Sequence, residues 1–295
     1  MLDQRADRAT LELTRYRLVE PFQPRRHHID DPAARGMLLL RHHDPTVAIP
    51  EVGVSFYSTV VQRHLAASYK GLAPHGAPSD RMSPALDDLS MQFALYARSA
   101  PGDVLDIGCG DGIATAAALA RGACVYAVDP DQAVLHHLLA RVPPVHAHRL
   151  RVRIGTLPSV NFKLPRFSAV HAARVLHLLD PLALQRSLQK FFHWLYPGGK
   201  LFLSTLTSAG EHWEFAESEI IQRKLAEDAW PGYLGDIRRL RPHWEGVSDA
   251  IHLLDEPILR RELATAGFEI EHISSYPLPW DPDQMCCAVV ARCAE

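Results

Sequence analysis

The 295-residue sequence has few cysteines and no large excess of either charge. The cysteines number five, they form no CxxC pair, and they show no metal-ligand spacing. Reduced thiols, as in a cytoplasmic protein, are therefore expected rather than a disulfide framework or a metal site. The formal net charge is −3, which argues against strong sequence-independent attraction to nucleic acid or to an anionic membrane.

Long apolar runs are also missing, since none approaches the roughly 18 residues that span a bilayer. The first eight residues carry charges of both signs and lack an apolar core, so no secretory peptide is predicted. The 17 histidines are mostly scattered, and we expect no metal site from them. With 47% apolar and 22% charged residues, the composition is that of an ordinary globular protein and excludes a wholly disordered chain.

The first hundred residues are predicted to precede the main domain. Residues 1–50 contain five prolines among interrupted apolar positions and are expected to form a partly irregular N-terminal extension. Residues 51–100 predict a helical cap. Its second helix is expected to begin at Pro84 with Ser83 as N-cap, and it carries Leu89 and Phe93 at helical spacing.

From residue 103 onward, short apolar strands alternate with helical patterns. We expect strands over 104–107, 124–128, 149–154, 168–173, 200–205, 268–275 and 286–293, with helices over 114–121, 132–141, 181–195 and 256–266. This alternation is typical of an α/β fold with a doubly wound, mostly parallel sheet of seven strands. The core is predicted over 101–207 and 256–295, and residues 208–255, which hold three of the five tryptophans, are predicted to form a helical lid insertion.

A glycine-rich loop is the most informative segment. The predicted strand over 104–107 runs into Gly108, Gly110 and Gly112, and a helix follows. Ligands bind at this end of strands in open α/β sheets. A dinucleotide site needs the spacing GxGxxG, but Ile113 occupies the place of the third glycine. Asp106 also lies inside the strand, where a buried acid needs a polar partner.

Several segments together resemble the class I S-adenosylmethionine-dependent methyltransferases. Asp106-Ile-Gly-Cys-Gly-Asp-Gly112 is similar to motif I of that family, and Val125-Tyr-Ala-Val-Asp-Pro-Asp131 is similar to its second motif. Residues 167–179 resemble the fourth-strand segment, 195–203 the turn before the fifth strand, and 263–270 the entry to the sixth strand. The resemblance covers about residues 100–207 and 256–294, and it implies S-adenosylmethionine as cofactor.

The resemblance also implies a set of cofactor-binding residues. Asp129 would bind the ribose hydroxyls, and Asp106 the amine of the methionine portion. Their alternative roles are a helix N-cap and a buried structural acid. The family's carboxylate at the end of the third strand is missing, and Thr156 stands there instead. The full set is Asp106, Gly108, Cys109, Gly110, Asp129, Pro130, Thr156, Leu157, Ala173 and Arg174.

Catalytic and substrate residues are predicted from position alone. His177 follows the fourth strand near the expected methyl donor and is a candidate general base; its alternative role is a histidine satisfied at a helix start. Aromatic residues of the flanking segments would roof the acceptor site, or would form the lid's own core. They are Tyr57, Tyr69, Trp213, Trp230 and Tyr233. Arg149, Arg151 and Arg153 are interpreted as guards of an edge strand rather than as a nucleic-acid surface.

The sequence therefore predicts a methyltransferase that acts on a small, apolar or aromatic molecule at an oxygen, nitrogen or carboxyl group. No nucleic-acid or membrane partner is expected. Three alternatives remain open at this point: a protein or RNA methyltransferase, a non-catalytic S-adenosylmethionine-binding protein, and a dinucleotide oxidoreductase on a similar sheet. Ile113 counts against the oxidoreductase.

Overall fold

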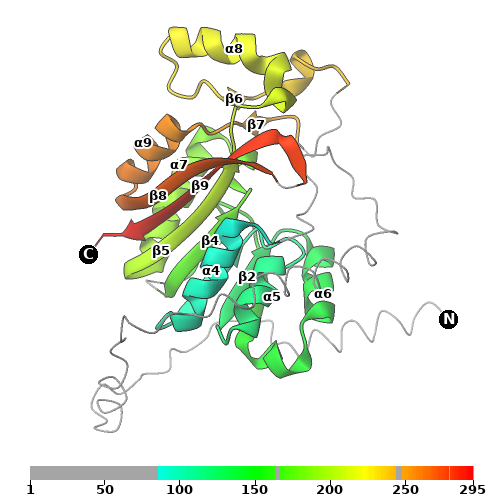
Figure 1. Cartoon of the computed structure of the whole chain (residues 1–295), viewed down its shortest axis with the longest axis vertical. Coiled ribbons are helices and arrows are strands. Elements are labelled where there is room, and N and C mark those ends of the chain that lie inside the picture. Colours follow the sequence, from blue (N-terminus) through cyan, green and yellow to red (C-terminus); the bar gives the residue numbers. More distant parts are fainter. Residues whose placement is uncertain (1–85, 164–165, 244–247, 279, 295) are drawn as a thin grey trace, which may run out of the picture.

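Seven strands form one sheet in the order β3-β2-β1-β4-β5-β9-β8 (Figure 1). The computed structural model describes residues 86–163, 166–243, 248–278 and 280–294. Strand β9 runs antiparallel to β5 and β8, and the other pairings are parallel. This confirms the predicted doubly wound, mostly parallel sheet. The strands are β1 (Asp103–Ile107), β2 (Val125–Asp129), β3 (Leu150–Ile154), β4 (Phe167–Ala173), β5 (Leu195–Leu206), β8 (Phe268–Leu278) and β9 (Asp281–Cys293).

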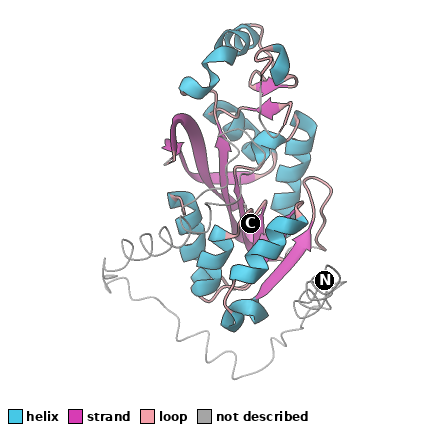
Figure 2. Ribbon diagram, turned by 90° about the vertical axis from the view of Figure 1, so that its right-hand side faces the viewer, coloured by secondary structure: helices cyan, strands magenta, loops and turns pink. Residues whose placement is uncertain are grey.

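Helices cover both faces of the sheet (Figures 1 and 2). One face packs α4 (Asp88–Ser99), α5 (Ile113–Ala120) and α6 (Gln132–Arg141), and the other packs α7 (Pro181–Trp194) and α9 (Glu256–Thr265). Neighbouring strand residues alternate between the two cores, as Val104 and Leu105 do in β1. Because both faces are buried, the central strands are nearly continuous apolar runs, which is why the sequence showed them clearly.

Helix α4 begins later than predicted. Its first residue is Asp88, and the Asp87 carboxylate accepts a hydrogen bond of 2.8 Å from the Ser90 N–H as the N-cap. Ser83 and Pro84, the predicted N-cap and first helical residue, lie outside the described residues. Both serine and aspartate are good caps, and Asp87 has a second partner, Arg174, that the local sequence does not reveal. The predictions for residues 1–50 and for the helix before residue 70 lie outside the described residues.

The predicted lid insertion is less helical than expected. Its described residues, 208–243 and 248–255, hold one α-helix, α8 (Glu214–Leu225), short 3₁₀ turns η5 (Glu211–Trp213) and η6 (Ile237–Arg239), and a two-stranded antiparallel sheet of β6 (Tyr233–Leu234) and β7 (Ile251–His252). These elements share a small core of their own around the fully buried Trp213. Figure 1 shows α8 and β6 beyond one end of the main sheet.

Two further features concern surfaces. Strand β3 is an edge of the sheet, as predicted, and Arg151 and Arg153 donate hydrogen bonds to the backbone oxygens of His148 and Asn161. These contacts fit the edge-guarding interpretation. In the part of the chain that the structure describes, no helix combines the length and the apolar character needed to cross a membrane.

Candidate functional site

The glycine loop connects β1 to α5 at the carboxyl end of the central strand. Gly108, Gly110 and Gly112 all have positive φ, at 65°, 51° and 72°. A Cβ on Gly108 would lie 2.3 Å from Val175 Cγ2, and one on Gly112 would lie 2.2 Å from Leu138 Cδ1. Gly108 and Gly112 are therefore required by packing as well as by backbone angle. Cys109, at the tip of the loop, is half-buried.

Asp129 ends β2 and joins the glycine loop to α6. Its Oδ2 accepts a 3.0 Å hydrogen bond from the Gly110 N–H, and its Oδ1 accepts one of 3.0 Å from the Asp131 N–H. Burial raises the pKa of Asp129, although these two N–H groups act in the opposite direction. The N-cap of α6 is Asp131, which accepts from the Ala133 N–H, so Asp129 does not cap that helix.

Asp106 lies at the base of the loop and is 1% exposed. Its Oδ2 accepts a 2.6 Å hydrogen bond from the Thr115 hydroxyl, and its Oδ1 is 2.8 Å from His171 Nδ1. The buried acid thus has two protein partners, which sequence reasoning had not identified. A direct contact between Asp106 and the amine of a ligand stays a prediction.

The loop after β3 borders β2 on its other side, where the Gly155 N–H donates to the Asp129 backbone oxygen at 3.1 Å. Pro130 and Thr156 are exposed, whereas Leu157 is buried in the core. The Thr156 hydroxyl bonds the Leu157 carbonyl at 3.3 Å. An adenine contact by Pro130, Thr156 or Leu157 stays a prediction.

Arg174 follows β4 directly after Ala173 and has a positive φ of 54°. A left-handed conformation in a residue other than glycine is often found at functional sites. Arg174 Nη1 donates to Asp87 Oδ2 at 2.7 Å, and its guanidinium lies 5.1 Å from the centre of the Trp280 ring. Burial raises the pKa of Asp87, but Arg174 and the bonds from Ser90 outweigh it, so the net pKa is lowered.

His177 lies in the turn η4 (Leu176–Leu178) after β4, but it is poorly suited to act as a base. Only 3% of the residue is exposed, and its Nδ1 has no hydrogen-bond partner. Burial, assisted by Arg174, lowers the pKa of His177 to about 3. A general base works best with a pKa near the operating pH. The catalytic role predicted for His177 stays a prediction, and its environment argues against it.

Three residues near Arg174 were not identified from the sequence. Ser204 on β5 and Tyr276 on β8 have buried hydroxyls that approach each other, and a hydrogen bond from Ser204 lowers the pKa of Tyr276. Burial nevertheless raises the pKa of Tyr276 and brings that of Cys286 to about 12, while Arg174 lowers both. The Arg174 N–H donates to the Ser204 backbone oxygen at 2.8 Å, and Tyr276 and Cys286 are opposite each other in the pairing of β8 with β9, so we treat these four residues as one cluster around Arg174.

The predicted roof residues have different surroundings. Trp213 is 0% exposed and donates from Nε1 to Gln284 Oε1 at 2.6 Å, so it forms the insertion's own core. Trp230 and Tyr233 are half-buried, with ring centres 5.1 and 5.3 Å from that of His252. Tyr57 and Tyr69 lie outside the described residues. A role of any of these residues in substrate binding stays a prediction.

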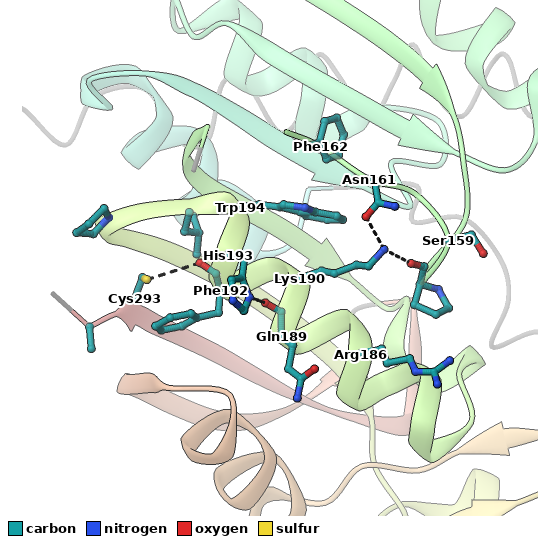
Figure 3. Close-up of a pocket in the computed structure, with 14 residues that line it drawn as sticks. Ser159, Asn161, Phe162, Arg186, Gln189, Lys190, Phe192, His193, Trp194 and Cys293 are labelled. Carbon is teal, nitrogen blue, oxygen red and sulfur yellow. Dashed lines mark hydrogen bonds between the residues drawn. The ribbon is translucent and has the colours of Figure 1, made fainter. Parts of the chain in front are cut away.

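A groove of about 970 Å³ lies elsewhere, between α7, the loop after β3 and the end of β9 (Figure 3). It contains none of the predicted site residues. Lys190 at its centre donates to the Val160 carbonyl at 3.0 Å and to Asn161 Oδ1 at 2.7 Å. The lysine therefore fixes the loop after β3 and is not free to bind a ligand.

The residues at the glycine loop fit S-adenosylmethionine. Each carboxylate oxygen has two lone pairs, and each oxygen of Asp129 accepts one hydrogen bond from the chain. One acceptor position per oxygen is left for two neighbouring hydroxyls, as a ribose presents. The fit rests on the donor set of this chain at the edge where α/β sheets bind ligands.

Comparisons with curated proteins give relatives with an O-methyltransferase name. Ubiquinone biosynthesis O-methyltransferase of Xanthomonas campestris pv. campestris is 34% identical over 129 residues, which are 41% of this chain and 51% of that protein. The protein of the same name from Azotobacter vinelandii is 32% identical over 114 residues, which are 38% of this chain and 47% of that protein. The chain thus spans about half the length of the curated relatives it matches.

Solved structures show the same fold at low identity. A S-adenosylmethionine-dependent methyltransferase from Methanosarcina mazei has a TM-score of 0.54 and 18% identity, with 68% of this chain and 97% of that chain covered. The 1,6-didemethyltoxoflavin-N1-methyltransferase of Burkholderia thailandensis, solved with 1,6-didemethyltoxoflavin and S-adenosylhomocysteine, has a TM-score of 0.52 and 21% identity. The alignment covers 84% of this chain and 94% of that chain.

A family model described as a methyltransferase domain matches residues 80–273. This range includes the glycine loop, Asp129, Arg174 and Ser204, and it exceeds half of the chain. The sequence motifs, the sheet order and this match agree. The chain belongs to the methyltransferase-domain family and has the fold of the class I S-adenosylmethionine-dependent methyltransferases, whose cofactor is S-adenosylmethionine.

Proposed function

We propose that the protein transfers a methyl group from S-adenosylmethionine to an oxygen of a small aromatic or apolar molecule. The observation that carries the cofactor half is the Asp129 carboxylate, which holds the Gly110 N–H and keeps one acceptor position on each oxygen. Support for oxygen as the acceptor comes from the name O-methyltransferase of the two curated relatives.

At the cofactor end, the residues of this chain would bind and orient S-adenosylmethionine. Asp129 would hold the ribose, and the loop 108–112 would lie against the methionine portion. When bound, S-adenosylmethionine supplies a methyl group on a positively charged sulfur. Transfer then depends mainly on the position of the acceptor and on exclusion of water, so little acid–base chemistry is required of the protein.

At the acceptor end, the cluster around Arg174 offers hydrogen-bonding groups. Tyr276 and Ser204 have buried hydroxyls that can bond each other, which leaves one of their two O–H donors for an acceptor molecule. Leaving a buried donor unpaired costs about 1–3 kcal/mol. The charge of Arg174 is already balanced by Asp87. The cluster therefore suits a hydroxyl or carbonyl oxygen better than an additional carboxylate. The Trp280 ring over Arg174 adds an apolar wall.

The described titratable groups near Arg174 are poor bases, and this favours an acceptor whose hydroxyl is itself acidic. Among the described groups whose pKa Arg174 affects, Tyr276 has a raised pKa and His177 one of about 3. Neither would remove a proton efficiently near pH 7. A phenol, with a pKa of about 10, needs far less assistance than an alcohol. A phenolic hydroxyl is thus the acceptor group that this site favours.

Two measurements test the proposed function. Thermal unfolding with S-adenosylmethionine, S-adenosylhomocysteine and NAD should show a higher melting temperature with the first two only, because a ligand that binds the native state stabilises it. Transfer of a labelled methyl group should then be detected on phenols and not on peptides or RNA. Stabilisation by NAD alone would contradict the proposal, and labelling of protein or RNA would favour the macromolecular alternative.

Replacement of Asp129 with alanine is expected to raise the Kd for S-adenosylmethionine by about 10- to 100-fold, since a hydrogen bond to a charged group contributes about 1.5–3 kcal/mol. Asp129→Asn should lose most of the same affinity, because its amide oxygen replaces only one of the two carboxylate oxygens that hold backbone N–H groups. Calorimetry checks both variants. An unchanged Kd in Asp129→Ala would remove this residue from the site.

Tyr276→Phe is expected to lower kcat/KM for a phenolic acceptor by about 10-fold while the Kd for S-adenosylhomocysteine stays within about 2-fold. The variant removes one buried hydroxyl whose partner in the chain is the neighbouring Ser204 hydroxyl, so the fold should lose only about 1 kcal/mol of stability. Steady-state kinetics and calorimetry measure the two effects separately. Equal kinetics in the variant and the wild type would place the acceptor away from Tyr276.

A further inference from the structure

A chain of side-chain hydrogen bonds runs beneath the glycine loop. The Thr115 hydroxyl bonds Asp106 Oδ2 at 2.6 Å, His171 Nδ1 lies 2.8 Å from Asp106 Oδ1, and Ser90 Oγ lies 3.1 Å from His171 Nε2. These four residues are 0–5% exposed. The chain crosses from α5 through β1 and β4 to α4, so it joins elements that are far apart in sequence.

His171 occupies the middle of this chain. It lies directly opposite Asp106 in the pairing of β1 with β4, and its ring stacks on Phe93 at 4.7 Å. A carboxylate oxygen accepts hydrogen bonds, so His171 Nδ1 donates to Asp106 Oδ1, and His171 Nε2 has the Ser90 hydroxyl as its partner. Both ring nitrogens are therefore engaged, and hydrogen bonds linked in this way strengthen one another cooperatively.

The Asp106 carboxylate needs both partners because of where it lies. Thr115 belongs to the first turn of α5, so its bond to Asp106 closes the base of the loop 108–112. His171 holds the other oxygen from the neighbouring strand. Loss of the histidine would leave a buried carboxylate oxygen without a partner and would free the carboxylate to rotate away from Thr115.

We propose that His171 is a positioning residue for the cofactor, acting through Asp106: it fixes the carboxylate that closes the base of the glycine loop. This inference rests on the proposed function only in taking S-adenosylmethionine as the ligand. It adds a residue of β4 to a site whose other parts belong to β1, β2 and α5.

The same residue types serve another purpose in hydrolases, where serine, histidine and aspartate form a nucleophilic triad. Ser90 is 5% exposed, and its own N–H is bound to the Asp87 carboxylate. Negative charge from Asp87 next to Ser90 opposes the oxyanion that a nucleophilic serine must form. The arrangement therefore favours a structural chain of hydrogen bonds over a nucleophile.

The test compares the Kd for S-adenosylhomocysteine, by calorimetry, in His171→Leu, His171→Asn and the wild type. His171→Leu should raise the Kd by about 10- to 100-fold, the range expected when a hydrogen bond to a charged group is lost. His171→Asn keeps a donor in the place of Nδ1 and should recover most of that affinity. Ser90→Ala, which removes only the distal bond, should raise the Kd by less than 10-fold and serves if His171→Leu does not fold.

Leu89→Ala is the matched control, because Leu89 is buried in α4 against the same core but takes no part in the chain. It should lower the melting temperature without changing the Kd. Equal Kd values in all variants would overturn the inference, as would equal weakening in Leu89→Ala, a failure of asparagine to restore affinity, or labelling of Ser90 by a fluorophosphonate probe. A wild-type protein that does not bind S-adenosylhomocysteine would instead contradict the proposed function.

Discussion

Gly110→Val is expected to abolish measurable binding of S-adenosylmethionine, a loss of at least about 1,000-fold in affinity. The residue has a φ of 51° and donates its N–H to Asp129 Oδ2. A β-branched side chain strongly disfavours that backbone region, so the peptide group must turn and the N–H must leave the carboxylate. The variant therefore disturbs the loop and the ribose-binding carboxylate together. Calorimetry with S-adenosylhomocysteine measures the loss.

Gly198→Val is the control for backbone strain. Gly198 has a φ of 75°, and a Cβ there would meet nothing within 4 Å. It lies near the start of β5, at the opposite end of that strand from its carboxyl end. The control should lose stability and keep the wild-type Kd. If Gly110→Val binds normally, the glycine loop is only a structural turn; if both variants lose binding alike, the effect is general destabilisation.

Excision of the insertion is expected to remove methyl transfer and to leave cofactor binding nearly intact. A short Gly/Ser linker would replace residues 209–254, between Ser208 and Asp255. The insertion contacts the carboxyl end of β4, because His252 Nδ1 donates to the Leu179 carbonyl at 3.1 Å. The glycine loop and Asp129 belong to β1 and β2 and should keep the Kd within about 3-fold. Transfer to a phenol should fall by at least about 1,000-fold, since the acceptor would be open to water.

Excision is also expected to lower the stability of the fold, and this loss must be measured separately from the loss of methyl transfer. Leu206, Leu278 and Cys286 pack against the insertion and would become exposed, so the melting temperature should fall. Hydrogen exchange of the intact protein gives an independent measurement: α8 and β6 should gain protection when cofactor and acceptor are both bound. Equal protection with and without ligands, together with full transfer by the linker variant, would contradict the lid and favour a partner-docking role.

The sheet could be predicted because its strands are buried on both faces. Strands such as β1 and β4 appear as short apolar runs, and glycines or charges mark their ends. The start of α4 could not be predicted, since Asp87 competes with Ser83 and its ion pair with Arg174 spans 87 positions. The insertion was predicted as helical from the stripe through Ala216 and Ile220, but β6 and β7 are only two residues each and leave no periodic pattern.

Some residues of the candidate site could also be predicted from the sequence, and others could not. Asp106 was found because an acid inside an apolar strand before a glycine loop needs a polar partner, and Asp129 because it ends a strand in a segment similar to the second motif of the family. His171 gave a similar signal, a titratable residue within the mostly apolar run of β4, and it was overlooked. Ser204 and Tyr276 gave none, because β5 and β8 meet only through β9, whose antiparallel register no local pattern encodes. His177 was predicted as a general base from its position after the fourth strand, and its burial could not be predicted from the sequence.

The first and last residues of the insertion are joined to each other by hydrogen bonds. Asp255 Oδ1 accepts from the Ser208 N–H at 2.8 Å and from its hydroxyl at 2.9 Å, and the Leu254 N–H bonds the Leu206 carbonyl. Both ends of the insertion therefore leave the main sheet at the same place. A segment anchored in this way can change in length and sequence while the parallel strands keep their register. If the insertion is the lid that we propose, its exchange between relatives would change the acceptor preference and leave the cofactor-binding core unaltered.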